Sequence, residues 1–195
     1  MIKAGIIGGA GYTAGELIRL LLNHEEVTID FVFSTSNAGN PVSHVHQDLT
    51  GSTNLVFTNT INTGVDVVFL CLGHGNSKAF LNANTFENHT KIIDLSNDFR
   101  LEADAVLNGK HFVYGLPELN SNSIKTSNYI ANPGCFATAI QLALLPLAKH
   151  ELLQNDVHIN ATTGATGAGT SLSATTHFTW RDNNFSYYNP SPHQH

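Results

Sequence analysis

Residues 3–23, KAGIIGGAGYTAGELIRLLLN, combine three local patterns in one order. An apolar run ends at Gly8, four glycines fall within residues 8–15, and the segment from Gly15 to Asn23 carries apolar residues at helical spacing. A buried strand, a tight glycine turn and a helix are therefore expected in succession. In α/β proteins this arrangement binds the pyrophosphate of a dinucleotide, because glycine lets the backbone come close and the helix N-terminus offers unpaired N–H groups.

The pattern continues along the first half of the chain. Further strands are expected over residues 28–33, 66–72 and 91–96, with a helix over residues 78–88. Near-continuous apolar strands separated by helices indicate a parallel sheet covered on both faces. The predicted fold class is α/β, with a doubly wound parallel sheet.

Length and charge limit the possible functions. With 195 residues and 42% hydrophobic residues, the chain is long enough for one domain and part of another. Its net charge of -6 offers no basic surface, so we expect no nucleic-acid partner. No apolar run approaches the roughly 20 residues of a membrane span, and no signal-peptide pattern is seen. Two cysteines fit a reducing compartment, and a cytoplasmic location is expected.

The glycine turn and the loop after the second strand suggest the cofactor. Residues 34–40, STSNAGN, contain hydroxyls and amides but no acid, whereas sites for NAD usually place a carboxylate there. NADP is therefore favoured, although the loop lacks the arginine that often holds the 2′-phosphate. The alternative is a glycine turn with only a packing role. The candidate cofactor-binding residues are Gly8, Gly11, Tyr12, Thr13, Ala14, Gly15, Ser34, Ser36, Gly39 and Gly73.

Residues 132–139, NPGCFATA, place Cys135 directly after a Pro-Gly turn and at the start of an apolar helix. The positive end of a helix dipole favours the thiolate over the thiol. Beside a nicotinamide, a thiolate can attack an acyl phosphate or an aldehyde. A structural cysteine is the alternative. Cys71, inside the apolar run VVFLCL, is expected to be a small buried hydrophobe.

Six motifs together resemble the N-acetyl-gamma-glutamyl-phosphate reductases of arginine biosynthesis, within the aspartate-semialdehyde dehydrogenase superfamily. They are GIIGGAGYTAGEL, FSTSNAG, DLSNDFRL, YGLPELN, NPGCFATA and TTGATGAG, and they span essentially the whole chain. The resemblance implies a Rossmann-type domain over residues 1–134 and, over residues 135–195, the start of an α+β catalytic domain. It also implies NADPH as reductant, Cys135 as nucleophile, and an acid-base histidine in His193-Gln194-His195, with His195 preferred to His193. Family members are longer, so the chain is expected to be C-terminally truncated and, when complete, a homo-oligomer.

The segment after Asp156 is rich in Thr, Gly and Ala, and it predicts a strand that leads into the glycine loop of residues 164–169. That loop would give backbone donors to an anion or form a flexible turn. Arg100 would hold a carboxylate or phosphate, or pair with Asp98 or Glu102. The candidate substrate contacts are Arg100, Asn132 and Gly167.

The expected reaction is the NADPH-dependent reduction of N-acetyl-gamma-glutamyl phosphate to its semialdehyde, with release of phosphate through a Cys135 thioester. Aspartate-semialdehyde dehydrogenase and a non-catalytic dinucleotide-binding fragment are the alternatives. A cysteine hydrolase without cofactor leaves the glycine turn unexplained. The histidines lack the clustered spacing of a metal site, so no metal is expected.

Overall fold

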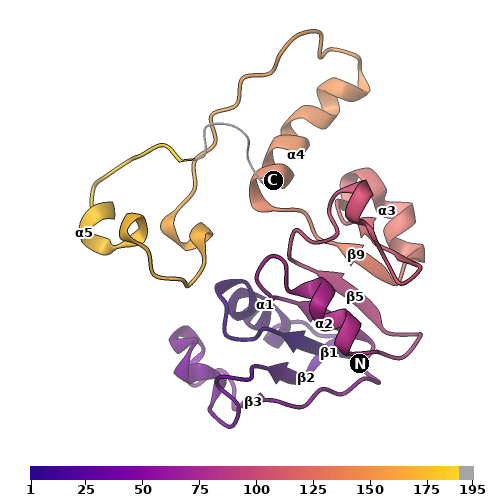
Figure 1. Cartoon of the computed structure of the whole chain (residues 1–195), viewed down its shortest axis with the longest axis vertical. Helices are drawn as coiled ribbons and strands as arrows, with labels where there is room; N and C mark the ends of the chain where they lie inside the picture. The colour runs from indigo at the N-terminus through magenta and orange to yellow at the C-terminus, as the bar shows by residue number, and fades with distance from the viewer. Residues whose placement is uncertain (189–195) are drawn as a thin grey trace. The chain divides into compact units, whose positions relative to one another are not determined.

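The computed structural model describes residues 1–188, and the chain divides into two compact units, Met1–Gly134 and Cys135–His195 (Figure 1). The first unit is built on a seven-stranded sheet in which every neighbouring pair is parallel. Its order is β3-β2-β1-β4-β5-β9-β8. The strands are β1 (Ile2–Ile7), β2 (Val27–Phe33), β3 (Phe57–Thr58), β4 (Val67–Leu70), β5 (Lys91–Asp94), β8 (Val113–Tyr114) and β9 (Tyr129–Ala131).

Helices and short segments connect these strands. The α-helices of this unit are α1 (Tyr12–Leu22), α2 (Ser77–Ala83) and α3 (Pro117–Thr126). Three 3-10 turns, η1 (Val42–His44), η2 (Gln47–Leu49) and η3 (Glu102–Asp104), lie in the longer connections. A separate antiparallel pair is formed by β6 (Val106–Leu107) and β7 (Lys110–His111).

The sheet is covered on both faces, because β1 has buried side chains on each of them. Ile6 and Ile7 are both fully buried, yet they belong to different core clusters because successive side chains point to opposite faces. Ile6 packs with Ala14 and Ile18 of α1, whereas Ile7 lies in the cluster that Phe80 and Leu81 of α2 contact. The predicted fold class, a doubly wound Rossmann-type α/β sheet, is confirmed.

The strand order reverses beside β1. From β1 the chain adds β2 and β3 on one side, and then returns to place β4 on the other side. In open parallel sheets, ligands bind outside the carboxyl ends of the strands at such a switch point. Ile7 and Leu70 are register partners at these ends, so the turns that follow them lie next to each other.

Most predicted elements of the first unit are present, with shifted ends. The helix predicted over residues 78–88 is shorter, because Asn84 adopts an extended conformation (φ -132°, ψ 130°) and its side-chain amide donates to the Phe80 carbonyl. The strands β3, β6, β7, β8 and β9 and the helix α3 were not predicted.

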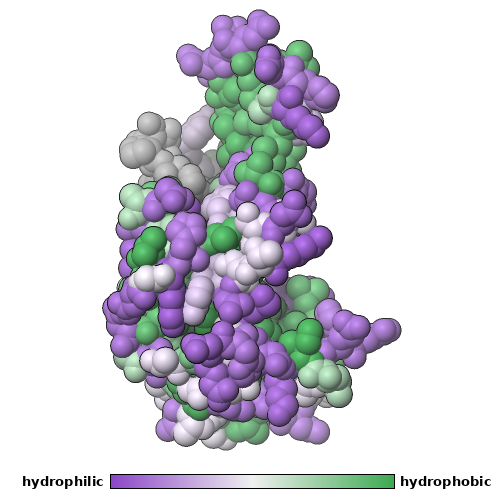
Figure 2. All heavy atoms as spheres, turned by 90° about the vertical axis from the view of Figure 1, so that its right-hand side faces the viewer, coloured by the Kyte–Doolittle hydropathy of each residue, from purple (hydrophilic) through white to green (hydrophobic). Residues whose placement is uncertain are grey.

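The second unit contains α4 (Cys135–Lys149), η4 (Ala165–Ala168), η5 (Ala174–Thr176) and α5 (Phe178–Arg181). The helix predicted to start at Cys135 is confirmed. The strand predicted after Asp156 is wrong, since a strand needs a hydrogen-bonded partner and no described segment of this unit provides one. No residue of α4 is buried, and its apolar side chains form a hydrophobic band in Figure 2. Within residues 1–188, no helix is long and apolar enough to cross a membrane.

Candidate cofactor and active site

Two glycines of the turn after β1 are required by close packing within the protein. Gly8 has φ +80°, and a Cβ atom there would lie 2.6 Å from the Cys71 carbonyl oxygen at the end of β4. A Cβ on Gly9 would overlap the side chain of Val32. These two positions explain why the turn can sit directly against β2 and β4.

At Gly11, by contrast, no close packing contact with the described residues requires a glycine. Its φ is an ordinary -80°, and the nearest atom to a Cβ there would be the Gly8 oxygen at 3.8 Å. Gly11 is the N-cap of α1, no side chain caps this end, and the first turn holds no acidic residue. A side chain at position 11 would thus make only ordinary van der Waals contacts with the described residues, at a helix start where Tyr12 and Thr13 are exposed and Ala14 is buried.

The loop after β2 is organised by its own hydrogen bonds. Ser34 is buried and its N–H donates to the Thr58 carbonyl at 2.9 Å. The Asn37 amide donates to both hydroxyls, at 3.2 Å to Ser34 and at 3.1 Å to Ser36. Ser36 itself is exposed, and Gly39 turns the chain with φ +86°. The loop thus presents a neutral hydroxyl surface at the carboxyl end of β2.

The loop between β4 and α2, which contains Gly73, is held by residues that follow β5. The Asp98 carboxylate accepts hydrogen bonds from Gly75 N at 2.6 Å and from Lys78 N at 3.1 Å. The His74 Nδ1 atom accepts from Asn97 N at 3.0 Å. His74 is therefore a loop anchor in this structure, and Asp98, whose predicted alternatives included an ion pair with Arg100, fixes the start of α2.

Two buried carboxyl groups behind this loop have opposite pKa shifts. Burial raises the pKa of Asp94, although Ser77 Oγ at 2.5 Å and Ser96 Oγ at 2.7 Å donate to it and oppose the shift. Burial alone would also raise the pKa of Asp98, but its hydrogen bonds, from Gly75 and Lys78 above all, outweigh burial and lower it. Asp98 is thus stabilised as the anion.

Arg100 and Asn132, two of the predicted substrate contacts, lie together. Arg100 donates from Nε to the Asn132 carbonyl and from Nη2 to the Leu95 carbonyl, both at 2.9 Å. The Asn132 N–H in turn donates to the Asp94 carbonyl at 2.7 Å. The guanidinium therefore ties the segment before the Pro133-Gly134 turn to the carboxyl end of β5.

The two cysteines have different environments, and Cys71 is half-buried rather than fully buried. Cys135 is exposed and is the first residue of α4. Burial, with a smaller contribution from Asp94, raises the pKa of Cys71 to about 12. In the second unit, Gly167 lies in η4, where its N–H donates to the Gly164 carbonyl at 3.1 Å. His193 and His195 fall outside the described residues.

His46 is a contact that the sequence did not suggest. It lies between η1 and η2, is 7% exposed, and its Nε2 atom is 2.7 Å from the Gly9 carbonyl oxygen. It also fills the space beside Gly15, where a Cβ would be 2.5 Å from Nδ1. No local pattern marks this histidine, because its partners Gly15 and Gly9 lie 31 and 37 positions earlier in the chain.

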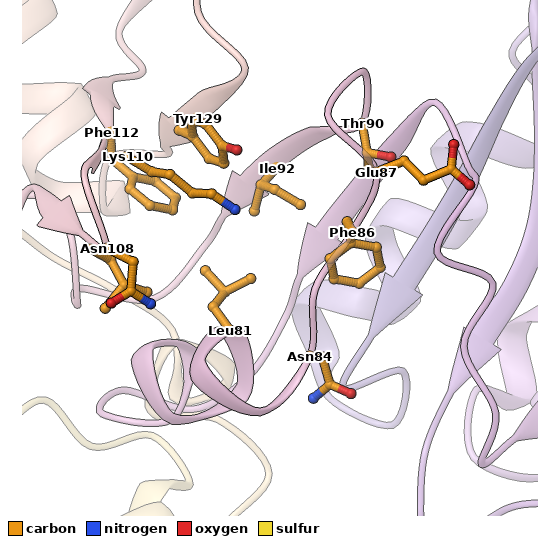
Figure 3. Close-up of a pocket in the computed structure, with 11 residues that line it drawn as sticks. Leu81, Asn84, Phe86, Glu87, Thr90, Ile92, Asn108, Lys110, Phe112 and Tyr129 are labelled. Carbon is orange, nitrogen blue, oxygen red and sulfur yellow. The ribbon is translucent and has the colours of Figure 1, made fainter.

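A small pocket in the first unit, separate from the predicted cofactor residues, is lined largely by apolar and aromatic side chains. It lies at the amino ends of β5 and β9, lined by Leu81, Ile92, Phe112 and Tyr129, with the Lys110 ammonium over the Tyr129 ring (Figure 3). None of the predicted site residues lines it. Among residues 1–188, no group of three or more His, Cys, Asp or Glu side chains could hold a metal ion.

Comparison with known proteins adds two family matches. Residues 3–127 match the model "semialdehyde dehydrogenase, NAD binding domain", and residues 135–195 match "semialdehyde dehydrogenase, dimerisation domain". Curated proteins from Flavobacterium johnsoniae and Christiangramia forsetii, both named N-acetyl-gamma-glutamyl-phosphate reductase, are 68% and 67% identical over the whole chain. The chain spans 60% of the length of each.

Two solved structures share the fold at low identity. An aspartate semialdehyde dehydrogenase with NADP from Candida albicans aligns with a TM-score of 0.57 and 17% identity, over 78% of this chain and 48% of the other. Aspartate semialdehyde dehydrogenase II from Vibrio cholerae aligns with a TM-score of 0.55 and 19% identity, over 76% and 47%.

Proposed function

Because the chain belongs to the semialdehyde dehydrogenase family, we propose that Met1–Gly134 binds NADPH and that Cys135–His195 begins the domain that carries the nucleophile. The reaction is the reduction of N-acetyl-gamma-glutamyl phosphate to the semialdehyde with release of phosphate, in arginine biosynthesis. Relatives with this name at 67–68% identity support this substrate over aspartyl phosphate, because the aspartate semialdehyde dehydrogenases share only 17–19%.

Gly11 is the observation that carries the cofactor proposal. The fold needs the glycines at positions 8 and 9 for packing, whereas packing within the described residues does not require glycine at position 11. A pyrophosphate at this helix start would accept from the N–H groups that follow Gly11. The Gly8 turn, the loop around Gly73 and the hydroxyl loop of Ser34, Ser36 and Gly39 would surround the rest of the dinucleotide, and the lack of an acid in that loop favours NADPH.

The covalent chemistry is assigned to Cys135. Its thiolate attacks the acyl carbon, a C–S bond forms, and the C–O bond to phosphate breaks, which leaves a thioester. Bound NADPH would supply the hydride that reduces this thioester. Collapse of the resulting thiohemiacetal breaks the C–S bond and releases the aldehyde as the thiolate returns. His195, or His193, is proposed to transfer the protons of these steps.

Three further residues are proposed to serve the substrate. Arg100 and Asn132 keep the segment that precedes the nucleophile in place through the Nε–carbonyl hydrogen bond of 2.9 Å. Gly167 is proposed to offer a backbone donor to the anionic substrate. The complete protein is proposed to be a cytoplasmic homo-oligomer, in line with the name of the second family model.

Gly11→Asp tests the cofactor site. Aspartate is a favourable N-cap and suits the extended conformation of Gly11, so the free energy of unfolding should hardly change. The carboxylate would lie against the pyrophosphate, and like-charge repulsion of about 1–4 kcal/mol should weaken NADPH binding at least about fivefold. Gly11→Ser is the matched control, because it also caps the helix but carries no charge. Titration of NADPH fluorescence measures both, and equal affinity in the Asp variant and the parent would refute the site.

A further inference from the structure

We propose that His46 is a positioning residue for the glycine turn, and that residue 15 is glycine to admit the His46 ring rather than to contact the cofactor. The proposal rests on the proposed NADPH site. It assigns a role to a buried histidine that takes no part in the chemistry above.

The contact with the turn is a short hydrogen bond. His46 Nε2 lies 2.7 Å from the Gly9 carbonyl oxygen. A carbonyl only accepts, so Nε2 carries the proton and donates. The ring is held in place by its burial and by Phe57, whose ring centre is 6.4 Å away.

The contact with the helix explains Gly15. A Cβ at this position would lie 2.5 Å from Nδ1, 2.8 Å from Cε1 and 3.2 Å from Cγ of His46. Glycine inside a helix costs about 1 kcal/mol relative to alanine, and Gly15 is in helical conformation, so backbone freedom is not the reason for it. The ring thus occupies the space that a side chain on α1 would fill.

The direction of the hydrogen bond has a consequence for the turn. In a planar trans peptide the C=O and the following N–H point in opposite directions. Because the Gly9 carbonyl points at His46, the Ala10 N–H points away from His46. His46 therefore fixes the orientation of one backbone donor in the turn, besides setting the distance between the turn and the start of α1.

A double-mutant cycle on the 195-residue protein separates this role from simple core packing. Gly15→Ala should weaken NADPH binding about tenfold in the parent, because the ring must move and release Gly9. In a His46→Ala background the same substitution should have almost no further effect, because the ring is gone. An equal loss in both backgrounds would mean that Gly15 faces the cofactor, and would overturn the proposal.

Two substitutions of His46 test the hydrogen bond itself. Gln places an amide N–H near the position of Nε2 and should keep NADPH affinity close to that of the parent, whereas Leu fills the space without a donor and should lose about tenfold. Melting temperatures show whether the two variants are equally folded. If the parent binds NADPH and the Leu variant binds it equally well, the positioning role is refuted. If the parent itself binds no NADPH, the proposed function fails, and this role falls with it.

Discussion

Replacing Asp98 with asparagine is expected to loosen the loop between β4 and α2. The carboxylate is 7% exposed and accepts from Gly75 N at 2.6 Å and Lys78 N at 3.1 Å. Asparagine keeps the shape, but it removes the charge and leaves a single acceptor oxygen. A hydrogen bond to a charged group contributes about 1.5–3 kcal/mol, so the loss of one and the weakening of the other should cost about 2–3 kcal/mol at pH 7.

The cost should depend on pH with a definite sign. The pKa of Asp98 is lowered in the folded state, because its hydrogen bonds outweigh the effect of burial. Its contribution is therefore complete above the unfolded-state pKa of about 3.9 and is lost as the pH falls through the lower folded-state pKa. The difference between parent and Asp98→Asn should thus narrow below about pH 4. Asp94, whose pKa is raised by burial, is present in both proteins.

Urea unfolding at pH 7, 5, 4 and 3 measures this difference in the free energy of unfolding. Circular dichroism is the suitable probe, because Trp180, the sole tryptophan, lies in the second unit and its fluorescence would not report on the first. Asp104→Asn is the matched control. Asp104 pairs with Lys78 Nζ at 3.0 Å at the surface, and its loss should cost less than about 1 kcal/mol. Equal losses in the two variants, or a difference for Asp98→Asn that does not change with pH, would refute the reasoning.

Two further expectations concern the proposed site. Iodoacetamide should label the exposed Cys135 in the folded protein, while Cys71, whose pKa is raised to about 12, should react only after unfolding. Peptide mass spectrometry measures the labelling of each cysteine, and equal labelling of the two in the folded protein would contradict this expectation. Ser36→Asp should reduce or reverse the preference for NADPH over NADH, because a carboxylate at this exposed position repels a 2′-phosphate; parallel titrations with both cofactors measure it, and an unchanged preference would exclude Ser36 from the site.

The long central strands and α1 could be predicted because each carries a complete apolar pattern. The strands β3 and β8 could not, since two residues are too few to show a period. The helix α3 has no buried residue and is rich in Asn and Ser, so it lacks the apolar stripe on which prediction depends. Its one local sign is Pro117 in the first turn of the helix, a position that proline favours.

In the candidate site, too, some residues could be predicted from the local sequence and others could not. Gly8, Gly11 and Cys135 follow from local context, because turn, helix start and residue type are adjacent in the sequence. The contacts of His46 with Gly9 and of Asp98 with Gly75 span 37 and 23 positions, and only the packing of the sheet brings them together. Sequence also predicted a cofactor contact for Gly15, and it could not show that the His46 ring packs against this glycine, because the two residues are 31 positions apart.

The place of β9 in the sheet has a consequence for synthesis on the ribosome. It is the last strand of the sheet in the chain, yet it lies between β5 and β8, both of which are made before it. Until residues 129–131 have left the exit tunnel, β8 has no neighbour to pair with, and β5 presents an open edge. The last strand to be made is therefore an interior strand of the sheet and not an edge strand. The Pro-Gly turn and Cys135 emerge immediately afterwards, so the thiol is translated only after every strand of the seven-stranded sheet has been made.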